Sequence, residues 1–145
     1  MPVSVRPLKA SDRDAWGGLW NAYLDFYGTE LPQKVYDTTF ARLLGDDPRD
    51  FSGLVAVVDD LPVGLAHYLF HRHCWRQDDV CYLQDLFAAP EMRGKGVGRL
   101  LIEAVYQRAG AASVYWLTQD DNATAQRLYD RIGQRTNFIK YQRPA

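Results

Sequence analysis

The sequence predicts an α+β fold in which helices pack on a mixed β-sheet, with the element order βααβββαβαβ. Apolar residues recur at helical spacing in several segments, and short apolar or aromatic runs bounded by turn residues lie between them. Glycine or proline marks most of the boundaries. The length of 145 residues fits one domain, which we expect to span residues 1–145.

The N-terminal part predicts one short strand and two helices. The strand is SVRP, at residues 4–7. Ser11 is expected to cap the first helix with Asp14 as the capping-box acid, and that helix ends near Gly28. Pro32 opens the second helix, which ends before the DDP turn.

The centre of the chain predicts three consecutive strands, at Phe51–Val58, Leu61–Phe70 and Val80–Ala89. The short DDLP connection between the first two indicates an antiparallel pair. A glycine-rich loop follows, and then a strongly amphipathic helix that ends at Gly110.

The C-terminal part predicts a strand, a helix and a last strand. The first of these strands is Ser113–Thr118, and Asn122 is placed to cap the helix that follows. One face of that helix carries apolar residues at helical spacing. The last strand spans Asn137–Gln142.

The composition excludes several classes of function. A net charge of −1 provides no basic field for nucleic acid. The first residues lack the pattern of a signal peptide, and no apolar stretch approaches the ~20 residues of a membrane span. We therefore expect a cytoplasmic protein with no membrane or nucleic-acid partner.

Metal binding is not expected either. Cys74 and Cys81 lack the spacing of a metal or redox motif and are expected to be reduced core or strand residues. His71 and His73 have the spacing of a metal-binding pair on a strand, but no third ligand is evident, and histidines at a strand end or substrate rim are the favoured interpretation.

The loop APEMRGKGVGR, residues 89–99, combines a strand end, three glycines and a helix start. A helix N-terminus has unsatisfied N–H groups and a partial positive charge, and glycines allow an anion to approach those groups closely. Arg93, Lys95 and Arg99 add positive charge. These features predict a binding site for a phosphate or pyrophosphate, whereas the alternative is a turn that only caps a helix.

Two other phosphate-binding loops fit less well. A Walker A loop requires GxxxxGK[ST], but here Lys95 precedes a glycine and no Ser or Thr follows. A Rossmann loop requires GxGxxG directly after a strand, but here Arg99 replaces the last glycine and 90–93 separate the strand from the first one. Asp120 does mimic the ribose-binding acid, so a Rossmann-like protein remains as a minor alternative.

These residues resemble the GNAT superfamily of acyl-CoA N-acyltransferases, whose signature is [Q/R]-x-x-G-x-[G/A] after the fourth strand. Arg93, Gly96 and Gly98 match it in register. The resemblance extends over nearly the whole chain, through SVRPLKASDRDAW, YLQDLFAAPEMRGKGVGRLLIEAV and WLTQDDNATAQRLYDRIG, and is greatest to the small branch with polyamine-type and histone-type enzymes. It implies a mostly antiparallel sheet of about six to seven strands flanked by about four helices.

The resemblance implies an N-acetyltransferase that moves an acetyl group from acetyl-CoA, its co-substrate, to a primary amine by direct attack on the thioester. The acceptor would be a small amine, an amino acid or a lysine side chain. The alternative is a catalytically silent acyl-CoA sensor. Relatives often dimerise, and the last predicted strand makes a homodimer one possible assembly.

The resemblance also assigns residues to the cofactor. The backbone of Leu86, Phe87 and Ala88 would bond the pantetheine arm. Asn122 matches an asparagine near the pantetheine, or is a plain helix cap. Tyr129 matches a tyrosine that protonates the leaving thiolate, or is a core aromatic residue. The residues expected around the pyrophosphate are Arg93, Gly94, Lys95, Gly96, Val97, Gly98 and Arg99.

The general base is harder to assign. Gln84 stands where polyamine-type relatives carry a glutamate, and an amide does not accept a proton usefully. Asp85 is the remaining candidate, with a structural role beside a loop donor as its alternative. On a regular strand these two side chains point to opposite faces. An N–H group at a bulge of this strand is expected to polarise the thioester oxygen.

The resemblance implies that the acceptor meets the end of the first helix and the loop after it, which form the acceptor wall in the family. Carboxylates and aromatic rings there would receive a cationic amine through charge and cation–π contacts. The alternative is ordinary helix surface and core. The candidate residues are Tyr23, Asp25, Tyr27 and Glu30, with Gln84 on the facing strand.

Overall fold

The computed structural model describes residues 2–145, and within them the chain forms a five-stranded sheet in the order β1-β2-β3-β4-β5. β1 to β4 pair antiparallel with their neighbours, and β5 joins β4 in parallel. The sheet is therefore mixed and mostly antiparallel, as predicted. Its strands are β1 (Ser4–Pro7), β2 (Ser52–Val58), β3 (Leu61–His71), β4 (Val80–Ala88) and β5 (Val114–Tyr115).

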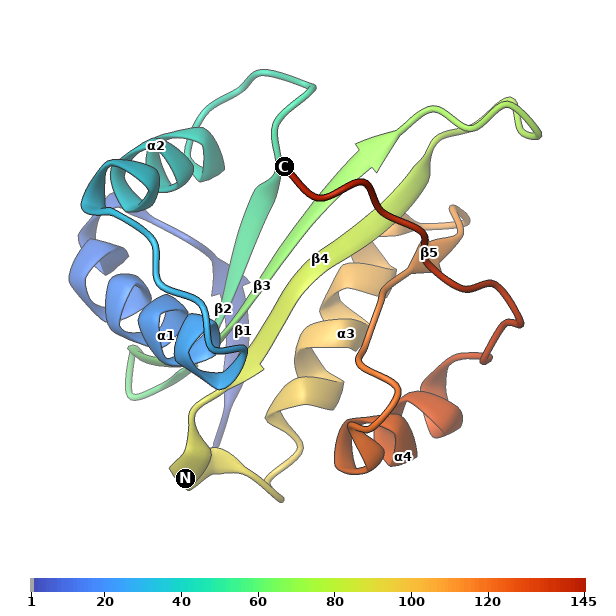
Figure 1. Cartoon of the computed structure of the whole chain (residues 1–145). Coiled ribbons are helices and arrows are strands. Elements are labelled where there is room, and N and C mark those ends of the chain that lie inside the picture. The colour runs from blue at the N-terminus through green and yellow to red at the C-terminus, as the bar shows by residue number, and fades with distance from the viewer. Residues whose placement is uncertain (1) are drawn as a thin grey trace.

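Four α-helices among residues 2–145 cover the sheet, which confirms the predicted number of about four helices. Figure 1 shows α1 and α2 on one side of the sheet and α3 on the other, with α4 beside α3. Two short 3₁₀ turns, η1 (Ala10–Asp12) and η2 (Pro90–Met92), precede α1 and α3. The α-helices are α1 (Arg13–Phe26), α2 (Gln33–Leu43), α3 (Val97–Ala109) and α4 (Ala123–Ile132).

The two faces of the sheet build separate cores because side chains alternate along each strand. Alternate residues of β2 and β3 pack under α1 and α2, together with Trp16 and Phe40. The residues between them pack under α3, together with Leu101 and Ile102. The first set includes Val55, Val57 and Leu65, and the second includes Leu54, Ala56 and Ala66.

A β-bulge interrupts the alternation in β4. Asp85 lies opposite His67 of β3, whereas Leu83 lies opposite the next residue of β3, so Gln84 is the extra residue. Leu83 packs in the α3 core, and Phe87 packs in the α1 core. The bulge therefore turns Asp85 to the face that α1 covers, and the rule for a regular strand does not apply here.

The predicted last strand is wrong. Asn137–Gln142 forms no strand, and the preceding strand is reduced from Ser113–Thr118 to β5. A strand needs a neighbouring edge to satisfy its N–H and C=O groups, and an apolar face needs a core to cover it. This segment has neither, since Phe138, Ile139 and Tyr141 are 79%, 78% and 87% exposed. The described residues thus form five strands rather than six to seven.

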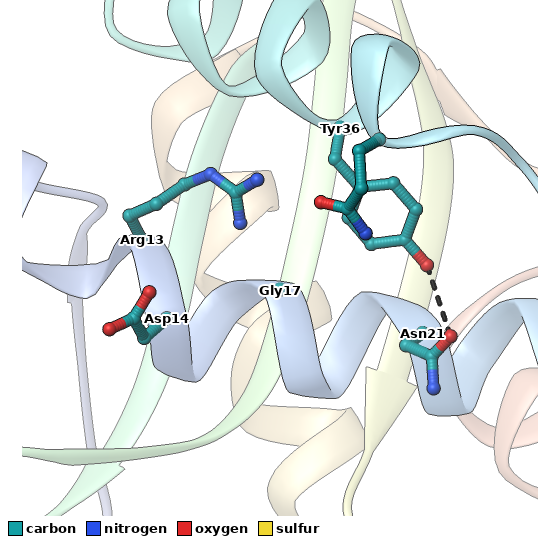
Figure 2. A pocket seen from close by; sticks show the side chains of 6 residues that line it. Arg13, Asp14, Gly17, Asn21 and Tyr36 are labelled. Atoms are coloured by element: carbon teal, nitrogen blue, oxygen red, sulfur yellow. Dashed lines mark hydrogen bonds between the residues drawn. The ribbon is translucent and has the colours of Figure 1, made fainter.

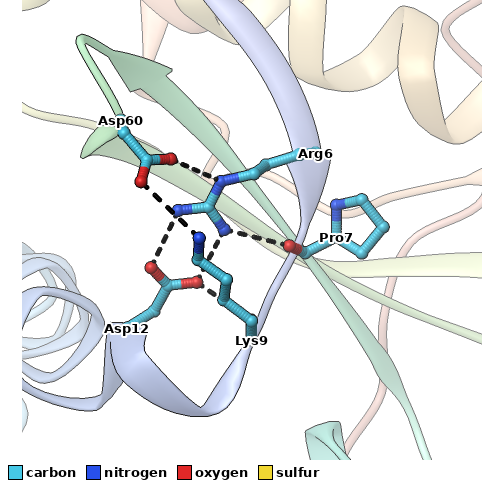
Figure 3. Close-up of polar contacts among 5 residues, drawn as sticks. All are labelled: Arg6, Pro7, Lys9, Asp12 and Asp60. Carbon is cyan, nitrogen blue, oxygen red and sulfur yellow. Dashed lines mark hydrogen bonds and ion pairs between the residues drawn. The ribbon is translucent and has the colours of Figure 1, made fainter.

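The predicted cap of the first helix is also wrong. Ser11 and Asp14 are exposed, and the buried acid of this turn is Asp12 (Figure 3). Its carboxylate accepts the backbone N–H of Lys9 at 2.9 Å and two guanidinium bonds from Arg6 at 2.8 and 2.9 Å. The turn before α1 is therefore held by an ion pair with β1, a partner that lies outside the helix.

No helix among residues 2–145 combines the length and the apolar character that crossing a lipid bilayer demands.

Candidate active site

The glycine loop leads from β4 through η2 to the N-terminus of α3. Gly94 and Gly96 have φ angles of +79° and +77°, a region that favours glycine, and a Cβ added at either would meet no atom within 4 Å. Their N–H groups donate to no backbone oxygen in the described chain. Helix α3 starts at Val97 without a side-chain cap, so its first N–H groups are free as well. Free main-chain N–H groups at a helix N-terminus are suited to binding an anion.

The charged side chains of the loop contribute less than the sequence suggested. The guanidinium carbon of Arg93 lies 5.9 Å from the ring centroid of Phe26, a cation–π contact with the end of α1. Arg99 Nε donates to Glu103 at 2.7 Å, one turn along α3. The N–H group of Lys95 is engaged in the turn, although its side chain is exposed. The side chains of Arg93 and Arg99 are thus engaged within the protein, whereas the amides of Gly94 and Gly96 are not.

The edge of β4 next to the loop is open. β5 pairs with β4 only at Cys81 and Tyr82, while the other edge of β4 pairs with β3 along its whole length. Within residues 2–145, no strand pairs with the β5 side of Leu86, Phe87 and Ala88. An open edge of this kind can bind an extended ligand arm as an additional strand.

Asp85 is paired with a residue that the sequence analysis did not single out. Asp85 Oδ2 lies 2.9 Å from His67 Nδ1, and Trp16 donates its Nε1–H to His67 Nε2 at 2.9 Å. The side chain of Asp85 is 16% exposed, whereas that of His67 is 3% exposed. The partner of Asp85 is therefore a buried histidine on β3 and not a loop donor. The available clue was a histidine inside the otherwise apolar run LPVGLAHYLF.

Three tyrosines surround Asp85. Burial and the negative charge of Asp85 raise the pKa of Tyr23, Tyr27 and Tyr82 above the ordinary value of a phenol, and for Tyr23 a hydrogen-bonding contribution from Asp85 adds to this shift. The rings of Tyr23 and Tyr27 meet edge to face at 5.1 Å. A partly exposed carboxylate among aromatic rings is a suitable environment for an ammonium group.

The other predicted acceptor residues lie elsewhere. Asp25 and Glu30 are exposed, and their charges act on Tyr36 of α2, whose pKa is raised by its burial first and by these two carboxylates after it. Gln84 is exposed at the bulge. The structure thus brings Tyr23 to Asp85 but does not bring the two acidic residues there.

The candidate residues of α4 are both ordered by local contacts. Burial and, to a smaller extent, electrostatic interaction with Tyr27 raise the pKa of Tyr129 to about 12. Its ring packs edge to face on Trp116 at 5.4 Å. Asn122 caps α4, because its Oδ1 accepts the N–H of Ala125 at 3.3 Å.

A recess of about 180 Å³ between α1 and α2 contains none of these groups (Figure 2). Tyr36 donates to Asn21 at 3.2 Å across it. None of the residues of the glycine loop or of the Asp85 surroundings lines the recess, so it is not the site described above. Its lining residues are Arg13, Asp14, Gly17, Asn21, Gln33 and Tyr36.

The histidines near the end of β3 serve local contacts. His71 Nε2 lies 2.8 Å from the Tyr115 hydroxyl, and His73 Nδ1 accepts the N–H of Trp75 at 3.1 Å. Cys81 is buried and its pKa is raised to about 11 by that burial, whereas Cys74 is exposed. Over the described residues, no three metal-ligating side chains are grouped closely enough to hold an ion.

An amide-lined loop at a helix N-terminus, an open strand edge beside it and a carboxylate among aromatic rings define an acyl-CoA-dependent transferase. Residues 16–134 match the family model described as the Acetyltransferase (GNAT) family. The chain belongs to this family, and it is an N-acetyltransferase that transfers an acetyl group from acetyl-CoA to an amine.

Individual relatives support the same family. The chain is 37% identical to the D-amino-acid N-acetyltransferase HPA3 of Saccharomyces cerevisiae, over 97% of this chain and 90% of that protein. It is 27% identical to the L-ornithine N5-acetyltransferase NATA1 of Arabidopsis thaliana, over 92% of this chain and 54% of that protein. The fold is similar to AAC(6')-Iy in complex with the bisubstrate analogue CoA-S-monomethyl-acetylneamine, with a TM-score of 0.84, 18% identity, and coverage of 100% and 99% of the two chains.

Proposed function

We propose that this N-acetyltransferase acetylates the amino group of small free amino acids, with D-amino acids as the first class to test. The observation that carries the proposal is the carboxylate of Asp85, which lies among phenol rings beside the open edge of β4. A partly exposed carboxylate among aromatic rings suits a small ammonium group. The 37% identity to a D-amino-acid N-acetyltransferase supports the same class of acceptor.

Acetyl-CoA would bind along β4 and the glycine loop. The free amides of Gly94, Gly96, Val97 and Gly98 support a pyrophosphate position at the start of α3. The open edge at residues 86–88 supports a pantetheine position, where the arm pairs with the backbone. The side chains of this loop would add charge near the phosphates.

Deprotonation of the amine is the first task of the site. A lysine-like amine has a pKa near 10.4, so most molecules are protonated at neutral pH and cannot attack. The ammonium group would donate a hydrogen bond to Asp85 and pass it one proton, directly or through water. The neutral nitrogen then attacks the thioester carbonyl carbon, whose oxygen is stabilised by an N–H group at the bulge of β4.

Collapse of the adduct breaks the carbon–sulfur bond. Tyr129 would donate its hydroxyl proton to the leaving sulfur and regain a proton from the acylated nitrogen, so that one proton in total is released per amide formed. A pKa raised to about 12 supports this role, because the phenol keeps its proton at every pH at which the enzyme works.

A screen of acceptors tests the proposal. Purified protein and acetyl-CoA are incubated with D- and L-amino acids, L-ornithine, polyamines and lysine peptides, and release of the free thiol is followed. We expect turnover with free amino acids and a loss of about 10²-fold in kcat/KM in Asp85→Asn, with unchanged acetyl-CoA affinity. Activity restricted to lysine peptides, or thiol release no faster than background hydrolysis, would contradict the proposal.

We further propose that residues 1–145 act as one catalytic domain, in the cytoplasm, as a homodimer whose contact includes the C-terminal segment. The exposed rings of Phe138 and Tyr141 and the exposed side chain of Ile139 support this contact, because large apolar side chains in one segment are typical of an interface. Sedimentation of the wild type and of a variant with serine at these three positions tests it. A monomeric wild type, or a variant that dimerises equally well, contradicts it.

A further inference from the structure

His67 uses both ring nitrogens in the core under α1. Its side chain is almost fully buried in the middle of β3, between Trp16 of α1 and Asp85 of β4. The indole Nε1–H of Trp16 lies 2.9 Å from Nε2, and Asp85 Oδ2 lies 2.9 Å from Nδ1. These contacts connect the centre of an apolar core to a carboxylate that is partly exposed.

The chemistry of the three groups determines where the ring proton is. An indole N–H only donates, so His67 Nε2 must accept and carries no proton. The proton of the neutral ring is then on Nδ1, where it is donated to Asp85. Protonation of Nε2 would bring two N–H groups face to face. Trp16 therefore selects the Nδ1–H tautomer of the neutral ring.

We propose that His67 is a positioning residue for amine deprotonation, and that Trp16 keeps it in the Nδ1–H form which the reaction requires. One oxygen of Asp85 is held by the Nδ1–H group, so the carboxylate has a fixed orientation and its second oxygen is left for the ammonium group. The inference rests on the proposed role of Asp85 as the proton acceptor. It adds two residues, neither of which touches substrate.

The other titratable and charged groups near these contacts belong to α1 and β4. Tyr23 and Tyr27 at the end of α1 and Tyr82 on β4 surround Asp85, and all three are uncharged phenols at neutral pH. The guanidinium carbon of Arg13, also on α1, lies 5.5 Å from the ring centroid of Trp16.

Trp20 provides a matched control. It stacks on Trp16 at 5.1 Å, is also buried, and its Nε1 has no hydrogen-bond partner among the described residues. Changing either tryptophan to phenylalanine removes the same atoms from the same core. Only Trp16→Phe removes a donor to His67.

The test compares these two variants by the pH profile of kcat/KM for the amine. We expect Trp16→Phe to lower kcat/KM about tenfold at neutral pH and to change the acid limb of the profile, because the ring is no longer held in the Nδ1–H form that orients Asp85. Trp20→Phe should keep the wild-type profile. Acetyl-CoA affinity should be unchanged in both, and urea unfolding should show that both are folded at the assay temperature.

Two further measurements do not depend on the tryptophans. His67→Asn retains an N–H group near the position of Nδ1 and should keep activity within about threefold, whereas His67→Leu should lose about 10²-fold. Nitrogen-15 NMR of the histidine side chains should find the Nδ1–H tautomer of His67 in the wild type. The Nε2–H tautomer or a charged ring at pH 7 would overturn the inference.

The failure of this inference can be told from the failure of the proposed function. If the wild type is active and the two tryptophan variants have the same profile, or if His67→Asn is as inactive as His67→Leu, the inference alone is wrong. If the wild type acetylates no amine, both the proposed role of Asp85 as proton acceptor and this inference are wrong.

Discussion

Gly64 of β3 lies directly beneath Val97, the first residue of α3. A Cβ added at Gly64 would be 2.8 Å from Val97 Cγ1 and 3.0 Å from the carbonyl oxygen of Phe87. Val97 is buried in the α3 core. The missing side chain at this position therefore allows the N-terminus of α3, with its free amides, to lie close against the sheet.

Gly64→Ala should consequently affect both stability and cofactor binding. We expect a loss of about 1–3 kcal/mol in the free energy of unfolding, because the new methyl group has no space, and about tenfold weaker acetyl-CoA binding, because α3 must shift. Gly53→Ala is the control, since the nearest atoms to its new Cβ are side-chain atoms, Leu8 Cδ2 at 3.2 Å and Leu43 Cδ2 at 3.3 Å, and not backbone. Calorimetric titration and urea unfolding measure both quantities. Equal acetyl-CoA affinity in the two variants would disprove the link.

Gly96→Glu should abolish most acetyl-CoA binding. The backbone at Gly96 has a φ of +77°, which strains a residue with a side chain by about 1–2 kcal/mol. A carboxylate at the N-terminus of α3 would also repel a phosphate group there. We expect affinity to fall by at least about 10²-fold while the protein stays folded. Gly18→Glu adds the same charge to an open position on α1 and should bind normally. The thermal shift that acetyl-CoA causes in each protein measures its binding. If acetyl-CoA stabilised Gly96→Glu as much as the wild type, the loop would not be a pyrophosphate site.

Tyr129→Phe should lower kcat by about 10²-fold without a change in acetyl-CoA affinity. Because the pKa of Tyr129 is raised from 10.0 to about 12, its proton contributes stability that is present below pH 10 and is lost as the pH rises through 12. The variant should therefore lose less stability than the wild type over that range. Tyr106→Phe is the control: its hydroxyl donates to the Ile132 carbonyl at 2.6 Å, so its loss should affect stability but not kcat. Equal kcat values for the two variants would exclude the proposed role of Tyr129.

Arg6→Met should destabilise the protein by about 3 kcal/mol at pH 7, because it leaves Asp12 buried without its partner. Hydrogen bonding to Arg6, followed by the N–H of Lys9, holds the pKa of Asp12 below 3.8. The stability from this pair is thus present above pH 3.8 and is lost as the pH falls through the folded-state value.

The difference between the wild type and Arg6→Met should therefore shrink as the pH is lowered from 6 toward 2. Urea unfolding at several pH values measures it. The exposed pair of Arg49 and Asp47 is the control, and Arg49→Met should leave stability unchanged. A pH-independent difference between the wild type and Arg6→Met would show that packing, and not the ion pair, is responsible.

Most of the fold could be predicted because its information is local. Helical periodicity specifies the helices, and the glycines at 94, 96 and 98 specify the loop. Neither signal depends on contacts with distant segments of the chain. The predictions were wrong where a segment's structure depends on a partner that is distant in the sequence. Asn137–Gln142 has strand composition but no edge to pair with, and the turn before α1 is held by Arg6 of β1 instead of its own Ser11.

The sequence by itself determined the order of the elements from β1 to α4 and the amide-rich loop, since each follows from residues close together in the chain. Asp85 and Tyr129 became candidates through the resemblance to the family, and their roles stay predictions. Only the tertiary structure decided which way Asp85 faces and what it touches. The bulge at Gln84 changes the side-chain alternation, and His67 and Trp16 reach the carboxylate from another strand and a helix. Such contacts depend on register and packing between segments far apart in the chain, which no local pattern encodes.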